Sequence, residues 1–252
     1  MEIWKAHYRD SGHDIDIEIV NSQNQSDNYP LSFVIDGFKF VGQSVGDFEL
    51  YDESQAEEAE KNFCLMKCGG YNSMIDTNFP YFYNLQRYSM SIDIPVCVVR
   101  KSDNAEIQGF IHVDFELKKS EKGSRYHCDD VFKYYDDYIV NKFYLTADGK
   151  IFKTKCKSLW FESGLQEIYR SLKPYYSLKC CFTCQYSDYS PYGSDDFGTM
   201  LCYRKNKSDY LKVNSKADFF EYLDEYEIRQ ETFVCEEYEP RVKCGGYRGF
   251  ID

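Results

Sequence analysis

The stretch YSMSIDIPVCVVR, residues 88–100, decides the fold class, because polar and apolar side chains alternate along it. This period of two is typical of a β-strand with one buried face. The two faces are formed by Ser89, Ser91 and Asp93 on one side and by Met90, Ile92 and Ile94 on the other. A polar turn at 101–104 leads into a second long run, EIQGFIHVDFELK, at 106–118. The sequence therefore predicts two long strands joined by a short turn.

Hairpin patterns surround this pair on both sides in the chain. Residues 3–20 alternate around the turn Asp10-Ser11-Gly12, and 31–41 and 136–155 contain the pairs Asp36-Gly37 and Asp148-Gly149. Asp-Gly favours a tight hairpin turn, because both central positions need a positive φ angle. A further short strand is expected at 48–51. We therefore predict that residues 1–155 form an antiparallel β domain, as a sheet or a sandwich.

One helix interrupts these strands. The segment SQAEEAEK, residues 54–61, predicts a short exposed helix with Ser54 as its N-cap. We interpret its run of acidic residues as a solvated face, which is the ordinary role of such a pattern.

The second part of the chain, 156–252, predicts a smaller α+β region rich in cysteine. Helices are expected at 162–172 and 215–226, from apolar stripes at helical spacing. Strands are expected at 176–186, 198–204 and 233–238. The fold class is therefore α+β and predominantly β. No linker marks the boundary near residue 156, so the two parts can also form one continuous domain.

The charge of the chain narrows the class of partner. Acidic residues number 42 against 30 basic ones, which gives a formal net charge of −12. Such a field repels nucleic acid and anionic membranes and favours a basic protein partner, although acidity also serves solubility alone. The first residues lack the basic start and apolar core of a signal peptide, and no apolar run approaches the ~20 residues that span a bilayer. We therefore expect a cytoplasmic protein.

Eleven cysteines, an odd number, argue against a disulfide framework in a reducing compartment. Cys181 and Cys184 have the C-x2-C spacing of a zinc knuckle, and a hairpin would bring Cys202 towards them. Cys244 is the fourth ligand that we predict. Other candidates for that position are Cys235, Cys156 and Cys180. Against structural zinc, no second C-x2-C is present and no glycine follows the first, so buried core thiols are the alternative.

Enzyme signatures are missing from the sequence. It contains no G-x-S-x-G, P-loop, dinucleotide-binding glycine pattern or H-E-x-x-H. An uncharacterised enzyme would have to use His127, Cys128 or the aspartates around Tyr192. Neighbouring residues on an extended chain point apart, which is poor geometry for His127 and Cys128 to act together. We therefore predict a protein without catalytic residues.

The pentapeptide KCGGY occurs twice, at 67–71 and at 243–247. The flanking sequences show no further similarity, so we interpret the two copies as similar glycine turns rather than as an internal repeat.

The stretch CFTCQYSDYSPYG (181–193), followed by GTMLC (198–202), resembles an uncharacterised family of bacterial cytoplasmic proteins. The resemblance extends over most of the chain, including the Tyr-Arg-Gly tail at 247–249. It implies a bacterial origin and a role as an immunity protein against an interbacterial toxin. It assigns no catalytic residue.

These observations lead to one functional hypothesis and two alternatives. The hypothesis is a non-enzymatic acidic binding protein that neutralises a basic toxin by covering its surface. The expected partner-binding residues are exposed side chains around the cysteine-rich hairpin, namely Tyr186, Asp188, Tyr189, Tyr192, Asp195 and Asp196. The alternatives are a zinc-stabilised interaction module with Cys181, Cys184 and Cys202 as ligands, and an uncharacterised enzyme.

Overall fold

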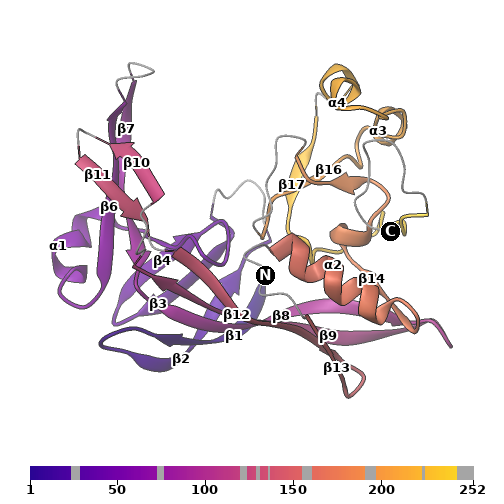
Figure 1. Cartoon of the computed structure of the whole chain (residues 1–252), viewed down its shortest axis with the longest axis horizontal. Helices are drawn as coiled ribbons and strands as arrows, with labels where there is room; N and C mark the ends of the chain where they lie inside the picture. The colour runs from indigo at the N-terminus through magenta and orange to yellow at the C-terminus, as the bar shows by residue number, and fades with distance from the viewer. Residues whose placement is uncertain are drawn as a thin grey trace. The chain divides into compact units, whose positions relative to one another are not determined.

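The computed structural model describes residues 1–23, 29–72, 77–119, 124–128, 131–135, 137–154, 161–190, 197–222 and 225–242 (Figure 1). For 70–72, 77–79, 124–128, 131–135 and 220–222 it describes the backbone alone. Strands dominate, and the few helices are short, so the protein is a mainly β member of the α+β class. The predicted fold class is confirmed.

One large sheet contains most of the described strands, in the order β13-β12-β9-β8-β1-β2-β3-β4-β5-β7-β6, with β14 also paired to β8. Its strands are β1 (Glu2–Arg9), β2 (Asp14–Asn21), β3 (Leu31–Ile35), β4 (Phe38–Gly42), β5 (Glu49–Leu50), β6 (Cys64–Asn72), β7 (Thr77–Gln86), β8 (Ser89–Arg100), β9 (Ala105–Lys118), β12 (Asp137–Ala147), β13 (Lys150–Lys153) and β14 (Tyr176–Lys179). Every pairing whose register is described is antiparallel.

Two small sheets and short helices complete the described chain. Strands β10 (Ser124–Cys128) and β11 (Val131–Tyr135) form one hairpin, and β15 (Ser187–Asp188), β16 (Met200–Cys202) and β17 (Glu227–Arg229) form a three-stranded sheet. The helices are α1 (Ala56–Ala59), α2 (Phe161–Leu172), α3 (Lys207–Tyr210) and α4 (Lys216–Tyr222), with 3-10 turns η1 (Glu53–Gln55) and η2 (Cys181–Thr183).

In β8, buried and more exposed side chains alternate, as the sequence pattern predicts. Met90, Ile92 and Ile94 are buried, whereas Ser89, Ser91 and Asp93 on the opposite face are half-buried or exposed. Burial of one face fixes the register, because a shift by one residue would turn every apolar side chain towards water.

Both Asp-Gly pairs form the tight turns that the sequence predicts. Asp36 and Gly37 have φ angles of 51° and 84°, and Asp148 and Gly149 have 52° and 69°. Positive φ at both positions matches the twist of the flanking strands and closes the hairpins β3–β4 and β12–β13.

The first KCGGY copy is not a glycine turn, so that interpretation is wrong. Residues 67–71 lie inside β6, and the pairing with β7 shifts register between Cys68 and Gly70. Gly69 has φ of +92°, and a Cβ atom there would lie 2.1 Å from the carbonyl oxygen of Pro80. The pair of glycines therefore permits a β-bulge, in which one strand carries an extra residue. The second copy, 243–247, lies outside the described residues.

The chain divides into two compact units. Unit 1 contains residues 1–22, 27–93 and 113–142, and unit 2 contains 23–26, 94–112 and 143–252. The long strands β8, β9 and β12 contribute residues to both. The predicted boundary near residue 156 falls at 155–160, outside the described residues, and stays a prediction.

In unit 1, aromatic rings form the core. Phe33 contacts the rings of Phe40 and Phe48, with centroids 5.3 and 4.7 Å apart, and Tyr8 stacks on Tyr88 at 5.5 Å. All five side chains are buried. Large rings bury much apolar surface each, which explains how strands so rich in charge still form a core.

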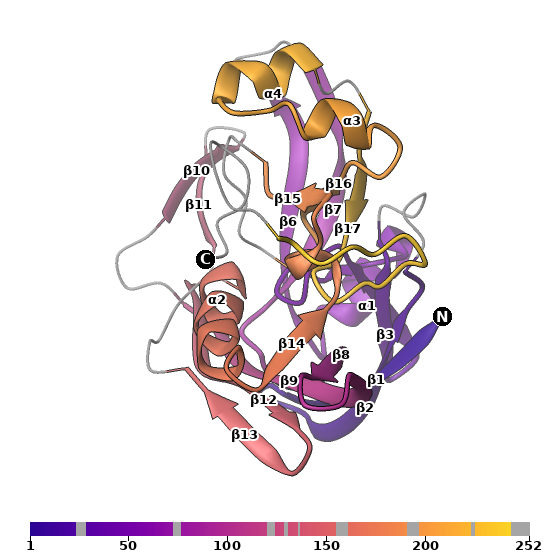
Figure 2. The ribbon, with the colours of Figure 1, turned by 90° about the vertical axis from the view of Figure 1, so that its right-hand side faces the viewer.

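In unit 2, α2 lies beside β14 (Figure 2). Leu165, Ile168 and Leu172 form its buried stripe, as the helical spacing predicts. The predicted strand at 233–238 is wrong, because this segment forms turns and the last described strand is β17. The predicted strand 176–186 is also interrupted, since β14 ends at Lys179 and η2 follows.

Candidate functional site

The described residues of the cysteine-rich hairpin are mostly buried. Cys180, Cys181, Cys184 and Cys202 are at most 6% exposed. Cys181 begins the 3-10 turn η2, and Cys180 and Cys184 flank this turn. The Cys184 amide donates to the Cys181 carbonyl at 3.0 Å. Burial raises the pKa of the Cys181 thiol well above its usual range and that of Cys180 to about 12. These thiols are therefore neutral at physiological pH, and neutral thiols are poor nucleophiles.

The proposed zinc ligands lie partly inside the described chain. Cys202 and Cys184 are near enough to Cys181 to act on its pKa. Among the described residues, however, no three His, Cys, Asp or Glu side chains are arranged to hold a metal ion. The fourth predicted ligand, Cys244, lies outside them. Structural zinc stays a prediction that metal analysis of the purified protein tests, and less than about half an equivalent would contradict it.

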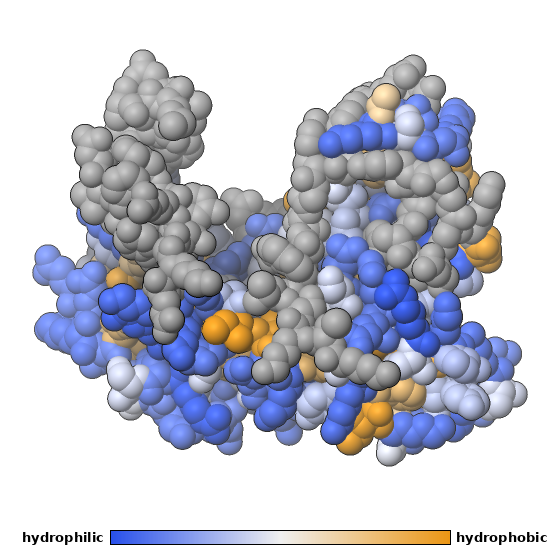
Figure 3. Space-filling view, in the orientation of Figure 1, coloured by the Kyte–Doolittle hydropathy of each residue, from blue (hydrophilic) through white to orange (hydrophobic). Residues whose placement is uncertain are grey.

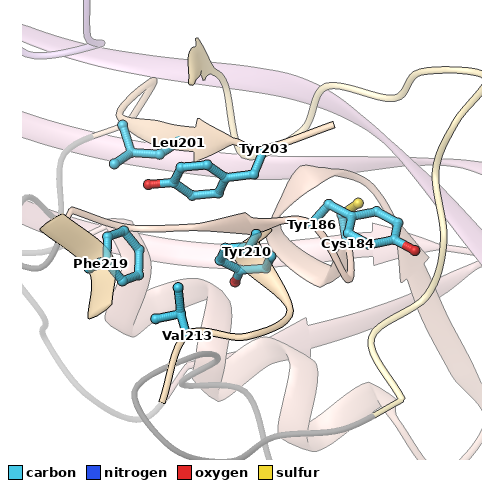
Figure 4. Packing of buried hydrophobic residues seen from close by; sticks show 7 residues of the cluster. All are labelled: Cys184, Tyr186, Leu201, Tyr203, Tyr210, Val213 and Phe219. Atoms are coloured by element: carbon cyan, nitrogen blue, oxygen red, sulfur yellow. The ribbon is translucent and has the colours of Figure 1, made fainter. Parts of the chain in front are cut away.

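Cys184 belongs to a buried apolar cluster together with side chains from β16, α3 and α4 (Figure 4). The rings of Tyr203 and Tyr210 stack there with centroids 4.7 Å apart, and Phe219 meets Tyr203 edge to face at 5.6 Å. Such packing is the ordinary role of a buried thiol, which behaves as a small apolar side chain.

Three of the predicted partner-binding residues are buried, which corrects the expectation that they are exposed. Tyr186, Asp188 and Tyr189 are 8%, 5% and 7% exposed. Asp188 accepts hydrogen bonds from the Tyr210 hydroxyl and the Tyr189 amide, each at 3.0 Å. Tyr186 donates to Glu239 at 2.9 Å. Buried polar groups need such partners, so these side chains connect the first strand of the hairpin to α3 and to the segment at Glu239. Tyr192, Asp195 and Asp196 lie outside the described residues.

Glu231 is a buried carboxyl group that the sequence analysis missed. It is fully buried, and it accepts hydrogen bonds from the Tyr189 hydroxyl at 3.0 Å and from the Gly198 amide at 2.7 Å. Burial raises its pKa to about 7, although the hydrogen bonds from Gly198 and Tyr189 oppose this rise. The sequence carried no signal for it, because a Glu beside Gln230 and Thr232 gives the pattern of a polar loop.

The enzyme candidates His127 and Cys128 lie in β10, opposite Phe132 and Val131 of β11. Only the backbone is described there, so their role stays untested. The aspartates at 195 and 196 lie outside the described residues.

An exposed acidic surface is present in unit 1, and we define it as the segment Tyr51–Lys61. Its five acidic side chains, all exposed, are Asp52, Glu53, Glu57, Glu58 and Glu60. Helix α1 fixes the segment through its buried residues Ala56 and Ala59. Asp52 is the N-cap of η1 and accepts from the Ser54 amide at 3.1 Å, whereas the N-cap of α1 is Gln55, so the predicted cap at Ser54 is wrong. Figure 3 shows hydrophilic side chains over the region of α1, at the left of the view.

Beside the acidic surface lies an open pocket of about 590 Å³, lined by residues 51–55 and by Gly37 and Lys39 of the β3–β4 hairpin. Tyr51 lines this pocket and is 62% exposed. The Lys39 ammonium lies 4.5 Å from the centroid of the Tyr51 ring. Glu49, which precedes this segment, has its pKa raised by burial and by the negative charge of Glu53. Exposed carboxylates therefore lie around one open pocket that contains the Tyr51 ring and the Lys39 ammonium.

The fold and these features define a mainly β protein of the α+β class with a buried cysteine-rich hairpin. The chain belongs to a family of unknown function, DUF6304, whose sequence model matches residues 2–187. No curated protein and no solved structure matches the chain. The family match ends within the stretch 181–193, so residues 188–193 and the tail at 247–249 lie beyond it. None of the described helices is both long enough and apolar enough to cross a membrane.

Proposed function

We propose that the protein is a non-enzymatic binding protein that captures a basic protein partner, a bacterial toxin, and neutralises it by covering its surface. The observation that carries the proposal is the acidic surface Tyr51–Lys61 with its adjoining open pocket. The toxin as partner comes from the family resemblance of the stretch 181–193, and the basic character of the partner comes from charge.

Electrostatic complementarity supports the choice of a basic partner. Within the acidic surface, the described ion pair joins Glu58 to Lys61, and the other four carboxylates have no ion pair in the described chain. Together with the net charge of −12, they produce a negative field on this side of unit 1. Fields of this kind accelerate association with a basic protein and fix its orientation, while they repel nucleic acid.

Tyr51 supplies the kind of contact that charge alone lacks. Tyrosine is enriched among the residues that dominate binding energy, because its ring is large and loses little conformational freedom. The pocket beside it can receive a long basic side chain of the partner, with carboxylates at its rim. A covering mechanism needs no catalytic group.

Charge reversal with matched controls tests the proposal. The probe is the product of the gene immediately upstream, purified as an inactive variant, and binding is measured by titration calorimetry. Glu57→Lys/Glu60→Lys is expected to weaken binding at least about tenfold and to reduce protection of cells that express the active toxin. The control Glu18→Lys/Glu236→Lys changes the net charge equally at exposed acids elsewhere.

Two outcomes contradict the proposal. If wild-type protein neither binds the upstream product nor protects against it, the toxin-binding function fails. If the control pair weakens binding as much as the α1 pair, binding depends on overall charge and not on the acidic surface.

A further inference from the structure

A second pocket, of about 360 Å³, lies in unit 1 where β1 ends, β8 begins and β9 ends. Hydrogen bonding holds the three strand ends together, since Arg9 pairs with Ser89 and the Leu117 amide donates to the Tyr88 carbonyl at 2.8 Å. We call it the basic pocket. The side chains that give it its chemistry are Arg9, Arg87, Ser89, Glu116, Lys118 and Lys119.

The alternation of the strands explains why these side chains meet. Tyr8, Met90 and Leu117 are buried on the inner face. Their neighbours Arg9, Ser89 and Lys118 therefore project from the opposite face, because successive residues of a strand point to opposite sides. Arg9, Ser89 and Lys118 thus lie at strand ends, whereas Arg87 lies between β7 and β8 and Lys119 directly follows β9.

The charge of this pocket is opposite to that of the chain. Four cationic side chains line it against two carboxylates, in a protein whose net charge is −12. One carboxylate, Asp10, is already engaged, because it accepts hydrogen bonds from the Tyr8 hydroxyl, the Gly12 amide and the His13 ring, each at 2.8 Å. Against the effect of burial, Asp36 and Asp10 raise the pKa of His13, which favours a positive imidazolium beside Asp10.

The lysines of the pocket remain available for a ligand. Lys118 and Lys119 are exposed, and within the described chain their ammonium groups make no ion pair or hydrogen bond. The Arg9 guanidinium contacts Asp14 through Nε at 3.2 Å, a single contact that leaves its other donors for a ligand.

We propose that the basic pocket binds a small soluble metabolite that carries a phosphate group. Guanidinium, ammonium and hydroxyl groups together are the donors that bind phosphate oxygens in proteins. The volume lies at the lower end of the range for ligand sites, which favours a small molecule over a polymer. The proposal is independent of the proposed toxin binding, since it concerns a different pocket of opposite charge.

The test uses inorganic pyrophosphate as the probe, with titration calorimetry on the full chain at neutral pH and at an ionic strength held constant with sodium chloride. Wild-type protein is expected to bind one equivalent, and Lys118→Glu is expected to weaken binding at least about tenfold. Lys153→Glu is the matched control, because it makes the same charge change at an exposed lysine of β13. It is expected to bind as the wild type does.

Three results would overturn the inference. They are the absence of binding to wild-type protein at millimolar pyrophosphate, an equal loss in Lys153→Glu, and unchanged binding in Lys118→Glu. Thermal unfolding of each variant shows whether it is folded. If Lys118→Glu is unfolded, Lys118→Gln replaces it with the same expected direction.

Discussion

Glu227 begins β17 and Glu231 lies two residues beyond its end, and their environments displace the pKa values of their carboxyl groups in opposite directions. Glu227 pairs with Arg204, Lys205 and Arg229 at 2.7, 2.9 and 2.6 Å. Although burial raises its pKa, the bonds from Lys205 and Arg229 lower it to about 2. Glu231 has no described cation beside it, and burial raises its pKa to about 7. The free energy of unfolding is therefore expected to depend on Glu227 at low pH and on Glu231 near neutral pH.

From the raised pKa of Glu231 we predict that the protein loses stability as the pH rises. Its pKa is raised from 4.5 in the unfolded chain to about 7 in the folded one, so its neutral form is favoured by folding. The stabilisation is complete below the unfolded pKa and is lost as the pH rises through the folded pKa, by about 3 kcal/mol. Glu231→Gln is expected to remove this part of the change in unfolding free energy between about pH 5 and pH 8. Urea denaturation measures it.

The control for this experiment is Glu57→Gln, which makes the same substitution at an exposed residue of the acidic surface. His7 and His13, whose pKa values are also raised, contribute in the same direction and remain in both variants. Equal pH dependence in Glu231→Gln and wild type would contradict the prediction.

From the lowered pKa of Glu227 we predict the opposite pH dependence of stability, in the acidic range. Its folded pKa lies below the unfolded one, so its stabilisation is present above about pH 4.5 and is lost as the pH falls towards 2. Because the side chain is 18% exposed, we expect Glu227→Gln to cost on the order of 2 kcal/mol at neutral pH. The cost should shrink in acid. A constant cost at every pH, measured by denaturation, would show that the ion pairs are not its source.

Removing the hydroxyl group of Tyr8 and that of Tyr88 gives two substitutions whose effects on stability can be compared. Their rings stack, but the Tyr8 hydroxyl donates to Asp10 at 2.8 Å, whereas the buried Tyr88 hydroxyl has no hydrogen-bond partner in the described chain. Tyr8→Phe is expected to destabilise by about 1–3 kcal/mol, because it leaves a buried carboxylate with one donor fewer. Tyr88→Phe is expected to be neutral or stabilising. Thermal unfolding of both variants checks the order, and a reversed order would refute the assignment.

We predict that a side chain at position 69 causes a steric clash in addition to the strain of its positive φ angle. An alanine Cβ would lie 2.1 Å from the Pro80 carbonyl oxygen, which belongs to the paired strand. Gly149 also has a positive φ, but nothing lies within 4 Å of a Cβ added there. Gly149→Ala should therefore cost about 1–2 kcal/mol, and Gly69→Ala clearly more, since it also disrupts the bulge. Chemical denaturation gives the difference, and equal costs would contradict the close approach.

The sequence predicted the parts of the fold that local patterns determine. Alternation located β8, and the Asp-Gly pairs at 36–37 and 148–149 located two hairpin turns. The bulge at Gly69 could not be predicted in the same way, because a glycine pair favours a turn unless a partner strand pairs across it. That partner, β7, is recognised only once the sheet has formed.

The candidate site was harder to predict, because burial depends on long-range packing. Tyr186, Asp188 and Tyr189 have the composition of an exposed turn. Their hydrogen-bond partners Glu239, Tyr210 and Glu231, which allow this burial, lie 53, 22 and 42 residues away in the chain. Conversely, the run of acids in 54–61 has the sequence pattern of an ordinary solvated face. Their place in the proposed binding surface depends on the pocket that residues 51–55 form with the distant β3–β4 turn.

The long strands β8 and β9 have a consequence for how this protein can change over generations. Since residues 94–112 belong to unit 2 while the chain on both sides of them belongs to unit 1, no single recombination point in the gene can exchange one unit intact. A crossover after residue 155 would pair Val98 of one parent with residue 178 of the other, and a mismatch there would disturb the pairing of β8 with β14. The two units are therefore expected to be inherited together.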